Sequence, residues 1–411
     1  MYHDHHFHPF GYASLVNGLE LMSARSLEDV LTKVSDRAAH VDGPIVGQRL
    51  NDETIREERL PTAADIDDVI SDRPVLLYRY CGHIAVANSK AMEVAGLSAE
   101  TADPDGGGFD RDSSGRPNGI LRETAVGVVS HALAPDIAAP SDSEIIAALA
   151  RLPMMGIGSV TGIVSMGEPV WCGVGNEIET LVRLASDLPI DMDVLVIAST
   201  PKDLADAKDL INRADGGIRF HGWKEFSDGS LGGHTAAMYE PFADRPDTVG
   251  TDRLDFAQAV EMGQASLDLG GVVAIHAIGD RANDSVLDVH DQLLRQGADP
   301  SSLRIEHASI LTNPSIDRMA DMGVTASVQP AFLASEETWL EKRLGGGRMS
   351  RAYPFRSLIE AGVPLLGGSD SPVELPDPET GINAAVVRHG INPDQALTRS
   401  QAEALFKPPA A

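Results

Sequence analysis

The sequence predicts an α/β fold, a (β/α)8 barrel of the TIM type with a long insertion after its first strand. From about residue 143 onward, short apolar runs alternate with longer amphipathic segments, which is typical of repeated βα units and a parallel sheet. Seven apolar runs occur there, and the opening stretch MYHDHHFH supplies an eighth. The predicted strands cover residues 1–8, 159–166, 190–199, 218–226, 271–279, 303–309, 323–330 and 362–370.

Helical patterns separate these runs. Several begin near Thr, Asn or Asp and end near Gly, as helix caps do. The clearest predicted helices lie within residues 176–187, 200–215, 253–270, 279–297 and 312–323.

The segment between strand one and the second barrel strand is too long for a loop. If residues 1–8 form strand one, the barrel comprises 1–8 and 143–411, and 9–142 is an insertion. Its strand-like run PVLLYRYCGHIAVANS at 74–89 predicts a folded cap or lid over the barrel.

Composition narrows the partners. Asp and Glu number 61 against 33 Lys and Arg, a net charge of −28, which should repel nucleic acid and anionic membranes and so excludes them as partners. The small-molecule substrate that we expect follows from the family resemblance described below. The acidity fits a high-salt adaptation or simply a solvated surface. Only Cys81 and Cys172 occur, and no leader or membrane-length apolar run is present, which predicts a cytoplasmic protein.

The first strand carries a candidate metal site. Alternate side chains of a strand share a face, so Asp4, His6 and His8 point one way, and two imidazoles at i and i+2 can bind one ion. This spacing alone is also typical of a solvated tail.

Three other predicted strands end in residues of types that commonly bind metal ions. They are His276 in VVAIHAIGD, His307 in LRIEHAS and Asp370 in LLGGSD. Singly, a strand histidine is more often a hydrogen-bonded core residue. The carboxyl ends of parallel barrel strands converge at one mouth, so together these positions predict a metal centre.

Lys224 lies in the strand-like run HGWKEF, where an unpaired ammonium would be expensive to bury. Reaction of its amine with carbon dioxide would give a carbamate, an anion able to bridge two metal ions about 3.5 to 4 Å apart. Alternatively, Lys224 reaches solvent or pairs with Glu225 or Asp228.

The order of these residues resembles the amidohydrolase superfamily, and specifically its YtcJ-like branch. Further motifs that carry the resemblance are GHIAVANSKAMEVAG (82–96), GRPNGILRETA (115–125), KEFSDGSLGGHTAAMYEPF (224–242), HAIGDRANDSVLD (276–288) and GSDSPVELPDPETGINAAVVRHG (368–390). Together they span nearly the whole chain.

The resemblance implies a role for each candidate. His6 and His8 would bind one metal ion, usually zinc, and His276 and His307 a second. Carboxylated Lys224 would bridge them. Asp370 would bind the first ion and transfer protons as the catalytic residue.

The resemblance also implies hydrolysis of an amide-type C–N bond, N-acyl or N-formyl, by a metal-bound hydroxide. A lactonase, esterase or phosphotriesterase on the same site is the nearest alternative. A non-catalytic barrel that binds a small molecule or partner, and a decarboxylating barrel with one metal and an unmodified Lys224, are others.

Two departures from the family stand out. His234 in DGSLGGHTA replaces a common arginine, which puts the binding of a substrate anion in doubt. The flanking β-sandwich of the family is expected to be absent or truncated, because the chain starts at strand one and ends at SQAEALFKPPAA. Exposed barrel surface would then favour a homo-oligomer.

Four further residues are assigned more loosely. Asp4 is expected to fix an imidazole tautomer, with packing or capping as the alternative. His83 and Glu123, in the insertion, are candidates for substrate contact or a structural hydrogen bond, whereas Asn88 is expected to cap a helix.

Overall fold

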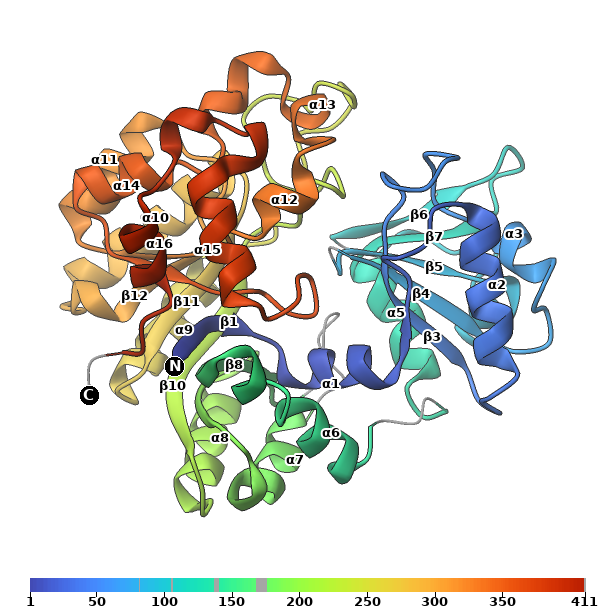
Figure 1. Ribbon diagram of the computed structural model, residues 1–411, viewed down its shortest axis with the longest axis horizontal. Coiled ribbons are helices and arrows are strands. Elements are labelled where there is room, and N and C mark those ends of the chain that lie inside the picture. The colour runs from blue at the N-terminus through green and yellow to red at the C-terminus, as the bar shows by residue number, and fades with distance from the viewer. Residues whose placement is uncertain (81, 105, 137–139, 168–175, 410–411) are drawn as a thin grey trace. The chain divides into compact units, whose positions relative to one another are not determined.

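The computed structural model describes residues 1–80, 82–104, 106–136, 140–167 and 176–409. Cys81 and Cys172 lie outside these residues. The chain divides into two compact units, which are described separately (Figure 1). Apart from segment 168–175, one unit holds residues 1–10 with the chain from Ile146 onward, and the other holds Gly11–Ile145.

The first unit is the predicted barrel. Eight strands pair in the order β1-β8-β9-β10-β11-β12-β13-β14, and all of the pairings are parallel. A parallel bridge between Phe7 and Ser371 joins the first strand to the segment after the last. The (β/α)8 TIM-type fold is confirmed. The strands are β1 (Tyr2–Phe7), β8 (Ile157–Ser165), β9 (Asp191–Ile197), β10 (Ile218–Phe226), β11 (Val272–Ala277), β12 (Leu303–His307), β13 (Thr325–Val328) and β14 (Leu365–Gly367).

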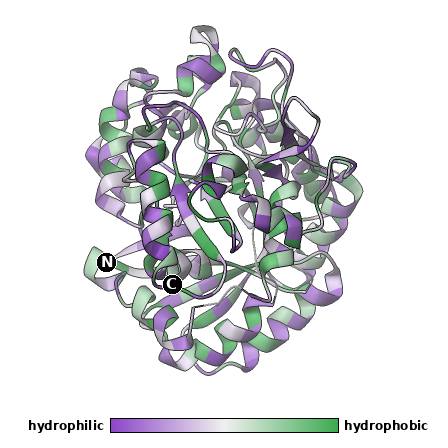
Figure 2. Ribbon diagram, turned by 90° about the vertical axis from the view of Figure 1, so that its right-hand side faces the viewer, coloured by the Kyte–Doolittle hydropathy of each residue, from purple (hydrophilic) through white to green (hydrophobic). Residues whose placement is uncertain are grey.

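Helices follow the strands and cover the outside of the barrel. The longer ones are α7 (Glu177–Leu184), α8 (Pro201–Arg213), α9 (Phe256–Asp268), α10 (Asp280–Arg295), α11 (Asn313–Met322), α14 (Phe355–Ala361), α15 (Pro378–Val387) and α16 (Arg399–Leu405). Helices in Figure 2 carry both hydrophobic and hydrophilic residues along their length, as amphipathic helices do.

Local sequence explains these elements. In α8 the Thr200 side chain accepts a hydrogen bond from the Asp203 backbone N–H, and Pro201 occupies the first turn, where its missing N–H has no cost. Leu204 and Ala207 then turn the same face toward the sheet. Strand β11, VVAIHA, is apolar on both faces because helices cover one side and the barrel interior the other.

The second unit has its own mixed sheet, in the order β2-β3-β4-β5-β7-β6. Its strands are β2 (Leu19–Glu20), β3 (Ile45–Leu50), β4 (Val75–Arg79), β5 (Ile84–Ala87), β6 (Gly107–Arg111) and β7 (Pro117–Glu123). Its helices are α1 (Pro9–Asn17), which starts in the barrel unit, α2 (Leu27–Ala38), α3 (Ala63–Asp67), α4 (Ser89–Val94), α5 (Thr124–Leu133) and α6 (Asp142–Leu149), which ends in the barrel unit.

Both faces of this second sheet are buried. Val75 and Leu77 of β4 pack in a cluster with Val30 and Val34 of α2, while Leu76 faces the opposite cluster. The alternation follows the two-residue period of a strand. Because the insertion has apolar cores on both faces of its sheet, it is a folded unit rather than a loop.

No helix within the described residues is long and apolar enough to cross a membrane.

Helix α10 buries a histidine among apolar residues. His290 is fully buried, and neither ring nitrogen has a hydrogen-bond partner within the described parts of the chain. The helix packs against α9, α11, β11 and β12. Burial disfavours the imidazolium and lowers the pKa of His290 to about 3 from the ordinary 6.5.

We therefore expect His290 to weaken the fold in acid. The unfolded chain takes up a proton as the pH falls through about 6.5, whereas the folded chain does not until about pH 3, so stability falls with pH across that window. Between pH 7 and pH 5 the loss is about 2 kcal/mol. Urea unfolding should show a shallower pH dependence for His290→Leu. Parallel curves for variant and wild type would contradict the assignment.

Candidate metal centre

Four imidazoles gather where the barrel strands end. The ring centroids of His6 and His8 lie 5.6 Å apart, those of His6 and His307 4.9 Å, and those of His276 and His307 4.4 Å. Three of the histidines come from the ends of β1, β11 and β12, and His8 follows β1 directly. The parallel barrel thus brings together residues 300 positions apart.

Asp370 completes a group that could hold a metal ion. Its Oδ1 lies 3.2 Å from Nε2 of both His6 and His8. The ligand atoms of these three residues all lie within 4.8 Å of one another. Nitrogen and carboxylate donors in this number suit zinc and similar divalent ions. The His8 side chain retains 22% exposure, so the group is accessible from the solvent.

The electrostatics of this group favour ionised Asp370. Burial alone would raise the pKa of its carboxyl, but His6, His8 and His307 outweigh burial and hold the pKa well below its ordinary value. The pKa of His6 depends on the same two effects. Burial lowers this pKa, but the carboxylates of Asp370 and Glu306 outweigh burial and raise it above its ordinary value.

His307 provides a further buried donor. Burial, together with neighbouring His276, holds the pKa of His307 well below its usual range, so the ring is neutral. Its Nδ1 has no hydrogen-bond partner among the residues that the structure describes. His307 and Asp370 also have φ values of 75° and 57°, in the left-handed region. Such conformations are strained for residues with side chains and are common at functional sites.

Lys224 is fully buried at the same end of the barrel. Its Nζ lies 3.6 Å from the centroid of the Phe226 ring and 3.4 Å from the carbonyl oxygen of Glu225. Its charge contributes to lowering the pKa of both His8 and His307, although burial is the larger cause. The Lys224 ammonium therefore favours the neutral form of two candidate ligands, His8 and His307.

Asp228 holds three backbone N–H groups at the end of β11 and in the loop after β10. Its carboxylate accepts hydrogen bonds from the backbone N–H groups of Ala237, Ile278 and Gly279 at 2.8 to 3.0 Å. One oxygen also lies 3.2 Å from Nε2 of His276. Asp228 thus anchors the loop after β10 beside a candidate ligand.

Glu306, which the sequence analysis did not single out, orients His6. Its Oε2 accepts a hydrogen bond from Nδ1 of His6 at 2.6 Å, and Arg304 donates to its Oε1 at 2.7 and 2.8 Å. Arg304 also donates to the carbonyl oxygen of His5 at 3.0 Å. The signal in the sequence was the pair of opposite charges two residues apart in the apolar run LRIEHAS.

The hydrogen bonds of Asp4 match the structural alternative rather than contact with an imidazole nitrogen. Its carboxylate accepts hydrogen bonds from the backbone N–H of His6 at 3.1 Å, and from the backbone N–H and hydroxyl of Ser369 at 2.9 and 2.6 Å. Asp4 therefore binds the segment after β14 to β1, and the tautomer of His6 is set by Glu306. β14 ends beside Asp4. Among the described residues, the groups within hydrogen-bonding distance of its carboxylate are therefore the backbone N–H groups of His6 and Ser369 and the Ser369 hydroxyl, and not an imidazole nitrogen.

His234 lies in a separate polar cluster. Its Nε2 is 3.0 Å from Oδ1 of Asp244, which also pairs with Arg343. Burial and then the charge of Arg343 lower the pKa of His234 to about 4. The residue is therefore neutral near pH 7, unlike the arginine common at this position in the family.

His83 and Glu123 belong to the second unit. Nδ1 of His83 lies 2.9 Å from Oε2 of Glu123, and the Glu123 N–H donates to the His83 carbonyl at 2.8 Å. The two loosely assigned residues therefore form one pair. Asn88 caps α4 by accepting from the Ala91 N–H at 2.9 Å, as predicted.

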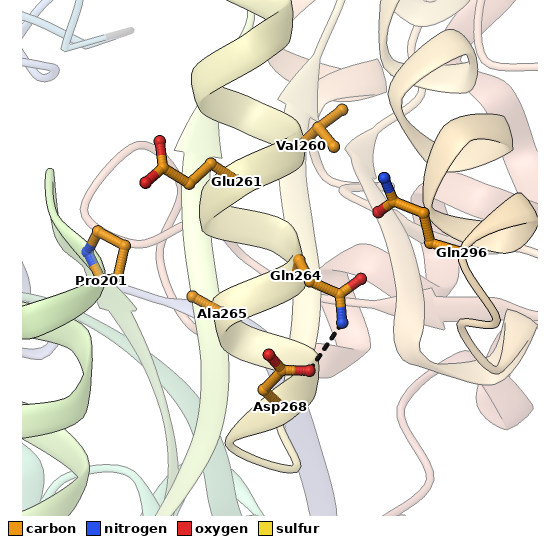
Figure 3. Close-up of a pocket in the computed structure, with 7 residues that line it drawn as sticks. All are labelled: Pro201, Val260, Glu261, Gln264, Ala265, Asp268 and Gln296. Carbon is orange, nitrogen blue, oxygen red and sulfur yellow. Dashed lines mark hydrogen bonds between the residues drawn. The ribbon is translucent and has the colours of Figure 1, made fainter.

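A shallow groove on the outside of the barrel is unrelated to these residues. It is lined by Pro201, Val260, Glu261, Gln264, Ala265, Asp268 and Gln296 (Figure 3). Gln264 donates to Asp268, one turn further along α9, at 2.7 Å. None of the predicted site residues contributes to it.

The family model for the amidohydrolase family matches residues 3–407. The chain belongs to the amidohydrolase family. The predicted resemblance is therefore confirmed, and the chain is a hydrolase of the amidohydrolase superfamily. The putative amidohydrolase YtcJ of Bacillus subtilis (strain 168) is 30% identical to it over 407 residues, which cover 98% of this chain and 75% of YtcJ.

Another protein and two solved structures are also similar. N-substituted formamide deformylase of Arthrobacter pascens is 28% identical over 365 residues, covering 86% of this chain and 66% of that protein. An uncharacterized metal-dependent hydrolase from Pyrococcus horikoshii OT3 superposes with a TM-score of 0.74 at 28% identity, covering 98% of this chain and 78% of that one. A metal-dependent hydrolase from Pyrococcus furiosus gives 0.72 at 29% identity, covering 98% and 80%.

The junction between Asp4 and Ser369 can be tested with a matched pair of serines. Ser369→Ala removes the hydroxyl that donates to the Asp4 carboxylate, so we expect a loss of about 2 kcal/mol of unfolding free energy. Ser371→Ala is the control, because its buried Oγ has no partner within the described residues and should change stability by less than about 0.5 kcal/mol. Urea unfolding measures both. Equal losses would show that the hydrogen bond to Asp4 has no special weight.

Proposed function

We propose that this amidohydrolase uses a divalent metal, zinc in the first instance, to hydrolyse an amide-type C–N bond of a small molecule. The observation that carries the proposal is the position of Asp370, 3.2 Å from Nε2 of both His6 and His8. The similarity to a deformylase of N-substituted formamides supports an N-acyl or N-formyl substrate.

The donor set fits such an ion. His6, His8 and Asp370 would hold it, with His276 and His307 as neighbouring nitrogen donors. A divalent ion, once bound, polarises a carbonyl and lowers the pKa of bound water toward neutrality.

Asp370 is the proposed proton carrier. Its ionised carboxylate can accept a proton from the attacking water and return it to the leaving nitrogen, which must be protonated to depart as an amine. Glu306 holds the His6 ring so that Nε2 faces Asp370.

Lys224 is proposed to lose a proton from its ammonium and to react as the amine with carbon dioxide, giving a carbamate with release of a second proton. The exchange would replace a fully buried ammonium among imidazoles with an anion, and thereby remove a charge that opposes a metal ion. The carbamate oxygens could then bind one or two ions.

Metal content tests the centre directly. We expect one to two equivalents of zinc in wild-type protein by elemental mass spectrometry, and a lower content in both His276→Ala and Lys224→Ala. Metal-free wild type after reconstitution with zinc and bicarbonate would contradict the proposal.

The same preparations should hydrolyse N-alkylformamides or N-acyl amines faster than lactones, esters or phosphotriesters. The opposite preference would replace the amidase proposal with an esterase or phosphotriesterase.

Glu306 should increase the affinity of the site for a metal ion, because it holds the candidate ligand His6 through a hydrogen bond. Partners that hydrogen-bond a ligand histidine typically change affinity by about 10- to 100-fold. We therefore expect Glu306→Gln, which keeps the shape and removes the charge, to weaken zinc binding by about that factor in competition with a chromophoric chelator. The control is Glu336→Gln, since Glu336 is another buried carboxylate and accepts from the Tyr353 hydroxyl at 2.6 Å. Equal affinities for the two variants would contradict the role of Glu306.

A further inference from the structure

Four of the buried polar atoms that lack a hydrogen-bond partner within the described chain lie at the ends of β12 and β13. They are Nδ1 of His307, Oγ of Ser309, Oγ of Ser327 and Oε1 of Gln329. Most buried polar atoms in folded proteins are paired, and each exception calls for an explanation. A ligand that pairs with these atoms is one, and Gln329 is the residue whose position can be argued most closely.

Strand register places Gln329 on the interior face of the barrel. Ser327 is the register partner of Glu306, whose carboxylate contacts His6 in the interior. Side chains two residues apart in an extended chain share a face, and the residue before a proline favours the extended conformation. Gln329 precedes Pro330, so it follows Ser327 on the same face, one step nearer the mouth.

Two contacts tie Gln329 to the candidate metal centre. Its carbonyl oxygen accepts a hydrogen bond from the Phe332 N–H at 3.2 Å, and the Phe332 ring stacks on His307 with centroids 6.1 Å apart and planes 16° apart. On the other side, the Val328 carbonyl accepts from the Gly368 N–H at 3.0 Å, two residues before Asp370. Gln329 therefore lies between the strand ends that carry His307 and Asp370.

The carboxamide has a defined orientation. Its Nε2 donates to the Ser327 carbonyl oxygen at 3.3 Å, and a flipped amide would set two oxygens against each other. Oε1 is consequently the atom left to accept, on a side chain that is 1% exposed.

We propose that Gln329 determines specificity by accepting, at Oε1, a hydrogen bond from an N–H group of the substrate. The inference rests on the proposed function and narrows it to amides that keep an N–H, as in a secondary amide. A substrate without that hydrogen leaves Oε1 buried and unpaired, which is the kind of mismatch that enzymes reject most strongly.

The test compares Gln329→Met with wild type and with a matched control. Gln395→Met is the control, because Gln395 accepts from the Ser357 N–H at 2.9 Å and donates to the Ser357 hydroxyl at 2.8 Å. The substrates are N-butylformamide, which has the N–H, and N-butyl-N-methylformamide, which lacks it. Two quantities are measured: the Tm without ligand, and the ratio of kcat/KM for the two formamides.

We expect the Tm of Gln329→Met to stay close to that of wild type, because the substitution removes an unpaired buried acceptor together with the long hydrogen bond from Nε2 to the Ser327 carbonyl. A purely structural glutamine, such as Gln395, should lower the Tm when replaced. We also expect the preference for N-butylformamide to fall about tenfold in Gln329→Met, the value of one neutral hydrogen bond, and to persist in Gln395→Met.

The outcomes separate this inference from the proposed function. If wild type hydrolyses both formamides and Gln329→Met slows them equally, recognition of the N–H is overturned and the amidase proposal stands. If wild type hydrolyses neither, the amidase proposal fails. The inference is then decided by binding, measured as the rise in Tm at high millimolar formamide. It predicts that N-butylformamide raises the Tm of wild type more than its N-methyl analogue does, and that the two formamides raise the Tm of Gln329→Met equally. A Tm of Gln329→Met without ligand that is lowered as far as that of Gln395→Met would also overturn it, because Gln329 would then be a structural residue.

Discussion

The closure of the barrel between β1 and the segment after β14 is the constraint on which the candidate site depends. The backbone N–H of Asp370 donates to the His6 carbonyl at 2.8 Å, and that of His8 donates to the Ser371 carbonyl at 2.9 Å. These bonds set the last strand end against the first and bring the Asp370 carboxylate to both imidazoles. The buried carboxylate of Asp4 reinforces the junction through Ser369. Without closure, the ligands from the two ends of the sequence would be at opposite edges of an open sheet.

A second feature of the barrel interior is a set of charged groups that are buried and paired with one another. Arg304, Glu306, His6 and Asp370 form a continuous series in which each charged or titratable group contacts one of opposite sign. Burial would raise the pKa of Glu306 and Asp370, but their cationic neighbours outweigh it and hold both carboxylates ionised. Breaking one member of such a series leaves a buried charge without compensation, which typically costs about 3 to 5 kcal/mol. The series therefore couples the stability of the barrel to the geometry of the site.

The mouth of the barrel also concentrates features that do not favour stability by themselves. Left-handed backbone occurs at His307, Ala308 and Asp370, and unpaired polar atoms occur at Ser309, Ser327 and Gln329. In a fold shaped only by stability, such positions would be glycine or apolar residues. Such features also occur elsewhere, as at His290 of α10, but at this end of the sheet they coincide with the candidate metal ligands, as they would in a binding site.

Sequence alone determined the fold class, the insertion and most of the candidate ligands, because these follow from local rules. Alternation along a strand put His6 and His8 on one face, and convergence of parallel strands put His276, His307 and Asp370 at one mouth. Only the tertiary structure decided which groups pair. Glu306 meets a histidine 300 residues earlier, and Asp4 binds Ser369 instead of an imidazole. No periodicity specifies such partners, since they depend on how far each strand extends before the barrel closes and on which buried charge lies within hydrogen-bonding distance.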